Sequence, residues 1–127
     1  MNGKTACRIY LIRHGETTNA GEVCFNGHFD VDLSDQGKNQ SRRIADALKS
    51  LPIKAIYSSD LKRTQIGAQY IAGEHKLKHI PCRELRELAF GDWEGLSITE
   101  VKRNYPDMLK ERLQNIEKFR VEGGESF

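Results

Sequence analysis

Apolar residues along the chain fall into short blocks that alternate between the spacing of strands and that of helices. Residues 7–12 are mostly apolar and β-prone, which predicts a buried strand. Residues 54–58 predict a second strand, and residues 78–82 predict a third at a sheet edge, because Pro81 cannot donate a ladder hydrogen bond. Strands that alternate with helices are typical of a parallel sheet with covering helices.

Helical patterns fill the segments between these strands. A polar stretch at residues 15–32 is long enough for a functional loop. Ser34 can then cap a helix that runs to about residue 50, and Ser59 or Asp60 can start the next helix. The first predicted strand therefore leads through this loop into a helix, and the second leads into a helix directly.

The last third of the chain has helix signals of its own. Residues 85–95 show no regular spacing and predict an irregular segment. Ser97 and Glu100 have the spacing of a capping box, and Pro106 suits the first turn of a helix that runs towards Phe119. We therefore predict an α/β fold of three layers, with a mostly parallel sheet, helices on both faces, and a sheet that is incomplete at the C-terminus.

Composition narrows the class of protein. Twenty Lys and Arg against eighteen Asp and Glu leave a net charge of +2, too small to indicate nucleic-acid or membrane-surface binding. No apolar run approaches the roughly 20 residues that span a bilayer. Three cysteines cannot all pair, and none forms a C-x-x-C motif, which suits a reducing compartment. We expect a single cytoplasmic domain.

Arg13 and His14 directly follow the first predicted strand. The carboxyl ends of parallel strands are where α/β proteins bind ligands. An arginine offers a planar fork for phosphate, the histidine beside it is a nucleophile or base, and Gly15 allows close approach to the backbone. The alternative is a tripeptide that occurs by chance, which its position after a strand disfavours.

Arg63 lies in the first turn after the second strand, so it repeats this arrangement. A helix N-terminus favours anions, and the guanidinium adds a full charge. Taken alone, the motif equally fits a capped helix with a solvated basic face. Arg13 at the neighbouring strand end favours the functional interpretation.

Residues 85–95 place the carboxylates of Glu87, Asp92 and Glu94 around Phe90 and Trp93. A glutamate lodged among apolar side chains has a raised pKa, as a general acid near neutrality requires. The equally weighted alternative is that both aromatic residues are core and every acid is solvated. The sequence shows no convincing set of metal ligands.

Together these motifs resemble the histidine phosphatase superfamily, which includes phosphoglycerate mutase and many small phosphatases. The resemblance covers residues 9–127. Its motifs are Leu11-Ile12-Arg13-His14-Gly15-Glu16-Thr17, Gly27-x-x-Asp30-x-x-Leu33-Ser34-x-x-Gly37, Tyr57-Ser58-Ser59-Asp60-Leu61-x-Arg63-Thr64, Leu85-Arg86-Glu87-x-x-Phe90-Gly91-x-Trp93-Glu94-Gly95 and Gly123-Gly124-Glu125-Ser126.

The resemblance implies a phosphomonoesterase in which His14 is phosphorylated. It implies that Arg13 and Arg63 clamp the phosphoryl oxygens and that Glu87 donates the proton, with no metal or cofactor. Two guanidiniums beside an imidazole agree with this role, because they disfavour its protonated form. They also stabilise charge on a transferring phosphoryl group.

Two departures from the family pattern stand out. The phosphate-binding asparagine that the family often carries is replaced by Ala20, so Asn19 is the substitute we assign, together with Gly27, to substrate binding. The family's second active-site histidine lies on a later strand, beyond Phe127. We therefore expect residues 1–127 to be a single domain that contains the N-terminal two-thirds of such an enzyme.

The segment Gly27-His28-Phe29-Asp30 resembles α-ribazole phosphatase, so α-ribazole 5′-phosphate is the expected small-molecule substrate. A phosphoglycerate mutase is one alternative, although residues 95–106 are short for its substrate-covering insertion. A non-catalytic phospholigand-binding fragment is another. We expect the isolated chain to be marginally stable or to self-associate through an exposed sheet edge, with little or no activity.

Overall fold

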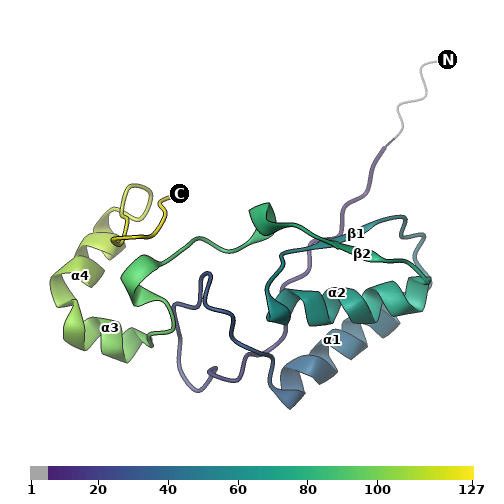
Figure 1. Ribbon diagram of the computed structural model, residues 1–127, viewed down its shortest axis with the longest axis horizontal. Coiled ribbons are helices and arrows are strands. Elements are labelled where there is room, and N and C mark those ends of the chain that lie inside the picture. Colours follow the sequence, from purple (N-terminus) through teal and green to yellow (C-terminus); the bar gives the residue numbers. More distant parts are fainter. Residues whose placement is uncertain (1–5) are drawn as a thin grey trace.

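The computed structural model describes residues 6–127, which form two lobes joined by loops (Figure 1). The first lobe contains, in chain order, α1 (Asp35–Leu48), β1 (Ile56–Ser58), α2 (Lys62–His75) and β2 (His79–Pro81). The second lobe contains α3 (Ile98–Asn104), α4 (Pro106–Gln114) and the C-terminal segment. Two short 3₁₀ turns follow β2: Arg83–Leu85 ends where the segment predicted to be irregular begins, and Gly91–Trp93 lies within that segment.

The first lobe is built on a β1–α2–β2 unit. The two strands are parallel, with Ile56 opposite His79, and α2 contacts both strands as well as α1. The core between them consists mainly of small and branched residues, namely Ala45, Ile56, Ala68, Ile71 and Ala72. Burying these apolar side chains is the main stabilisation of this lobe. The predicted α/β class with parallel strands is confirmed.

Local capping explains where α1 and α3 begin. The Ser34 hydroxyl accepts the Gly37 N–H at 3.0 Å, and α1 runs from Asp35 to Leu48, two residues short of the predicted end. The capping box of Ser97 and Glu100 is present in both directions. These helix starts are therefore as predicted.

α2 begins at Lys62, later than predicted, because its cap comes from elsewhere in the chain. No side chain at Leu61 caps the helix. Instead the Asp30 carboxylate accepts the Lys62 N–H at 2.8 Å, across 32 residues of sequence. A helix N-terminus needs such partners for its free N–H groups. This bond fastens the loop at residues 15–32 to the start of α2.

The second lobe encloses Trp93, which is completely buried. Phe25 packs against it edge-on, with ring centroids 5.2 Å apart, and Phe119 lies 5.4 Å from it on another side. Phe119 therefore belongs to this core rather than to the last helix, which ends at Gln114. The interpretation of Trp93 as core is confirmed, and the cluster holds the 15–32 loop against the 85–95 segment.

The prediction of a buried strand at residues 7–12 is wrong. Within the described residues this segment joins no ladder, and Ile9 and Leu11 are 75% and 93% exposed. Extended backbone becomes a strand only when a neighbour supplies hydrogen-bond partners on its flank. Apolar spacing alone does not provide that neighbour.

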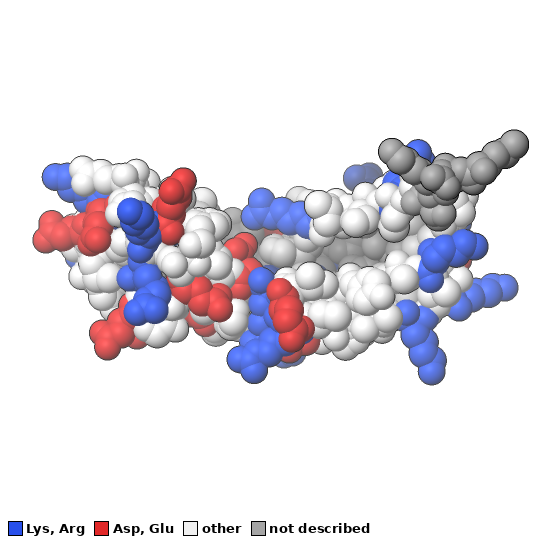
Figure 2. Space-filling view, turned by 90° about the horizontal axis from the view of Figure 1, so that it is seen from above, with Lys and Arg blue, Asp and Glu red and all other residues white. Residues whose placement is uncertain are grey.

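The strands of the first lobe also carry exposed apolar side chains. Tyr57 is 59% exposed and Ile80 is 45% exposed. Figure 2 shows that acidic side chains gather on the half with α3 and α4, whereas much of the other half presents uncharged surface with basic side chains at its rim. Self-association through this region stays a prediction.

Candidate active site

The loop that carries His14 is held by the first two turns of α1. The backbones of Gly15 and Gly37 approach so closely that a Cβ atom on either glycine would overlap the other segment. The Ser34 N–H donates to the Glu16 carbonyl at 2.9 Å, and the Gln40 carboxamide oxygen accepts the Glu16 N–H at 2.9 Å. These contacts fix the backbone on the C-terminal side of His14.

The His14 imidazole is half-buried and lies with Nδ1 2.7 Å from the Gly15 carbonyl oxygen. A carbonyl can only accept, so Nδ1 carries the proton and the lone pair is on Nε2. Burial lowers the pKa of His14 from its ordinary value of 6.5, and the charges of Arg63 and Arg13 act in the same direction. The Gly15 hydrogen bond and the charge of Glu87 oppose this shift. These effects together favour the neutral imidazole, whose free Nε2 is chemically able to act as a nucleophile.

His14 faces an open cavity of about 280 Å³. It is lined by Arg13, His14, Gly15, Glu16, Thr17, Ala20 and Gln40. The cavity thus brings together two of the predicted site residues, Arg13 and His14. Gln40 also lines the cavity and was not predicted from the sequence. It lies three residues after Gly37, on the same side of the helix, and this spacing is the signal that could have identified it.

The Arg63 side chain is buried, with 3% of the residue exposed. Its Nη1 donates to the Phe29 carbonyl at 2.8 Å and its Nη2 to the Gly27 carbonyl at 2.6 Å. Among the described residues, its buried Nε has no hydrogen-bond partner. Arg63 is not among the residues that line the cavity, but it is near enough to His14 to lower the pKa of the imidazole.

Glu87 is exposed, and its carboxylate accepts the neighbouring Leu88 N–H at 2.9 Å. The expectation of a glutamate lodged among apolar side chains is therefore wrong for this residue. Burial lowers the pKa of both His14 and Arg63, and the charge of Glu87 opposes that lowering in each case. Glu87 is thus near enough for its charge to reach both groups, although it does not line the cavity.

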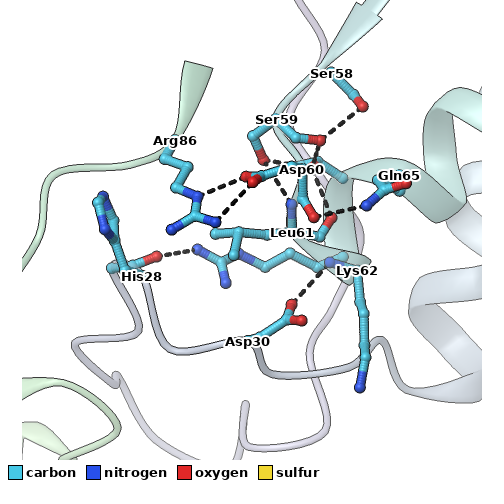
Figure 3. A network of polar contacts seen from close by, with 12 residues as sticks. His28, Asp30, Ser58, Ser59, Asp60, Leu61, Lys62, Gln65 and Arg86 are labelled. Atoms are coloured by element: carbon cyan, nitrogen blue, oxygen red, sulfur yellow. Dashed lines mark hydrogen bonds and ion pairs between the residues drawn. The ribbon is translucent and has the colours of Figure 1, made fainter. Parts of the chain in front are cut away.

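A bidentate ion pair anchors the chain next to Glu87. Arg86 donates from Nε and Nη2 to the two Asp60 oxygens, at 2.5 and 2.7 Å (Figure 3). This hydrogen bonding lowers the pKa of Asp60. Asp60 lies in the short connection between β1 and α2, so the pair ties the backbone next to Glu87 to the segment that leads to Arg63.

The structure places Asn19 outside the cavity lining. Its carboxamide accepts from the Thr17 hydroxyl at 2.8 Å and donates to Asn26 at 2.7 Å. Ala20, which stands where the family often has asparagine, lines the cavity instead. The Gly27 carbonyl oxygen accepts a hydrogen bond from Arg63 Nη2. The φ angle of Gly27 is +48°, a backbone conformation that favours glycine.

Comparison with known proteins decides the family. Residues 9–127 match the family described as the histidine phosphatase superfamily (branch 1). The chain belongs to this superfamily. The resemblance expected from the motifs is therefore confirmed, and the loop at His14 lies in a histidine phosphatase domain.

Relatives within the superfamily carry different names. Phosphoglycerate mutase-like protein 4 of Arabidopsis thaliana is 40% identical over 118 residues, covering 91% of this chain and 51% of the plant protein. Phosphoserine phosphatase 1 of Hydrogenobacter thermophilus is 34% identical over 119 residues, covering 94% and 56%. The crystal structure of the alpha-ribazole phosphatase from Shigella flexneri matches with a TM-score of 0.83 at 26% identity, covering 91% and 57%.

The chain therefore spans about half the length of the curated relatives it matches. Across residues 6–127, no group of three or more His, Cys, Asp or Glu side chains is placed to hold a metal ion. No helix in the described part of the chain is long and apolar enough to cross a membrane.

Proposed function

We propose that the protein containing this chain is a phosphomonoester hydrolase that works through a phosphohistidine intermediate on His14. The observation that carries the proposal is the contact of Nδ1 with the Gly15 carbonyl, which leaves Nε2 as the free nitrogen. That nitrogen belongs to a neutral imidazole flanked by arginine charges. A neutral imidazole with a free Nε2 lone pair is suited to attack phosphorus.

The reaction divides into two transfers. His14 Nε2 attacks phosphorus as the bond to the leaving oxygen breaks, and Glu87 gives that oxygen a proton. The ionised Glu87 then takes a proton from water, whose oxygen attacks phosphorus, so that inorganic phosphate leaves and His14 is regenerated. Arg13 and Arg63 stabilise the negative charge on the phosphoryl oxygens in both steps.

The two arginines supply the positive charge that a metal provides in other phosphatases, so we propose that turnover needs no divalent ion. Cytoplasmic location is part of the same proposal, supported by three cysteines that are all free. Activity that survives EDTA and is unchanged by added magnesium supports metal independence. A strict requirement for a divalent ion contradicts it.

α-Ribazole 5′-phosphate is the first candidate substrate, supported by the sequence of residues 27–30 and by the match to an alpha-ribazole phosphatase. The test is to measure the release of inorganic phosphate by the full-length protein from a panel of phosphomonoesters. The panel contains α-ribazole 5′-phosphate, phosphoserine, 3-phosphoglycerate and aryl phosphates. We expect hydrolysis of the panel, fastest for α-ribazole 5′-phosphate. Transfer between phosphoglycerate positions without release points to a mutase, and no turnover points to a binding module.

The protonation of His14 gives a separate prediction. Burial and the neighbouring arginines favour the neutral imidazole, so the midpoint of His14 protonation should lie below 6.5, the ordinary pKa. An NMR titration should give the His14 resonance a midpoint below 6.5, and that resonance is assigned by its absence in His14→Ala. Replacing Arg63 by methionine should move that midpoint upwards. A His14 midpoint at or above 6.5 contradicts the prediction.

A further inference from the structure

Glu94 is one of the three acids of residues 85–95, and the proposed reaction does not use it. Its side chain is half-buried, and its Oε1 accepts two backbone N–H groups, from His28 at 2.8 Å and from Phe90 at 3.1 Å. The carboxylate thus joins the loop at residues 15–32 to the segment at residues 85–95. His28 and Glu94 are 66 residues apart in the chain. Its Oε1 is thus occupied by two N–H groups of the protein backbone.

The first of these bonds leads to Arg63 through a single peptide group. The Gly27 carbonyl accepts from Arg63 Nη2 at 2.6 Å, and the His28 N–H of the same peptide donates to Glu94 at 2.8 Å. A carboxylate at one end and a guanidinium at the other polarise that peptide in the same sense. Each of the two hydrogen bonds therefore strengthens the other.

The close fit around Gly27 shows how tightly this peptide is held. A Cβ atom at Gly27 would lie 2.8 Å from Glu94 Oε1 and 2.8 Å from the Leu88 carbonyl oxygen. The loop is therefore pressed against the segment that contains Glu94. Moving the Glu94 carboxylate would release the Gly27 carbonyl from its present orientation.

Arg63 depends on that orientation. Its two terminal nitrogens are bound by the Gly27 and Phe29 carbonyls, one on each side of His28. The guanidinium plane, and with it the direction of the unpartnered Nε, is set by these two oxygens. We infer that Glu94 is a positioning residue, which orients the Arg63 guanidinium for phosphate through the Gly27–His28 peptide. The inference rests on the proposed function, in which Arg63 binds the phosphoryl group.

A double-mutant cycle tests this role in the full-length protein, with inorganic phosphate as the probe and calorimetry as the measurement. Glu94→Ala should weaken phosphate binding about tenfold, the effect of misplacing one charge-assisted hydrogen bond. In an Arg63→Met background the same change should weaken binding by less than about twofold, because the group it positions is gone. Glu94→Gln should restore most of the affinity, since its amide oxygen accepts the same N–H groups.

Asp92 supplies the matched control. It is an exposed acid in the same segment, and Asp92→Asn should leave phosphate binding and kcat/KM unchanged. Thermal unfolding of each variant checks that it is folded. If Glu94→Ala is not folded, Glu94→Asp takes its place in the cycle, because the shorter side chain keeps the charge but cannot reach both N–H groups.

Two results overturn the inference. The first is that folded Glu94→Ala binds phosphate as tightly as the wild type. The same result in Glu94→Asp counts where that variant replaces Glu94→Ala. The other is an equal loss with and without Arg63, which shows a general structural role. In both cases wild-type phosphate binding and turnover would leave the proposed function intact. A wild-type protein that binds no phosphate overturns the proposed function, and this inference with it.

Discussion

Replacing His14 by alanine is expected to lower kcat/KM for a phosphomonoester on the order of 10⁴-fold or more, because it removes the nucleophile itself. Phosphate binding should survive, since Arg13 and Arg63 are still present. Steady-state kinetics on the full-length protein, with calorimetry of inorganic phosphate, measures both quantities. Loss of turnover with retained binding is the signature of a group that acts in the chemical step.

His75 provides the control for this substitution. It lies at the end of α2, outside the cavity lining, and His75→Ala should retain wild-type kcat/KM. If His14→Ala keeps more than about a tenth of the activity, the reaction does not pass through this imidazole.

Glu87→Gln should lower kcat for alkyl phosphates by about 10²–10⁴-fold, the usual contribution of general acid catalysis. The amide keeps the size of the side chain but cannot donate the proton that an alkoxide leaving group needs. Aryl phosphates leave more readily, so the loss should be much smaller for them. Comparing kcat for one alkyl and one aryl ester in the same variant isolates the proton transfer.

Glu84 is a matched control, because it is also an exposed glutamate in the same connecting region. Glu84→Gln should leave both esters unaffected. Equal losses for the two esters in Glu87→Gln show that Glu87 acts on something other than the leaving group.

The sequence predicted best what short-range contacts determine. Ser34 caps α1 through the N–H of a residue three positions away, and Ser97 does the same for α3. Such contacts are contained in a few consecutive residues, so spacing alone reveals them. Arg13 and His14 likewise share one cavity because they are neighbours in the chain.

Features that depend on distant partners could not be predicted this way. Asp30 caps α2 from 32 residues away, and Glu94 binds His28 across 66 residues. Residues 7–12 have the composition of a buried strand, but a strand also needs a neighbour, which apolar spacing cannot supply. Phe90 and Trp93 follow Glu87 closely in the sequence, but both pack into the core of the second lobe and Glu87 is left exposed.

The phosphorylated intermediate is the most direct test of the proposed function. The full-length protein, mixed with a ³²P-labelled phosphomonoester and quenched within milliseconds, should carry label that is stable to alkali and labile to acid, as expected for a phosphoramidate. Peptide mapping should place it on His14, at Nε2. Label that persists in His14→Ala, or that resists acid as a serine ester does, contradicts a reaction through this histidine.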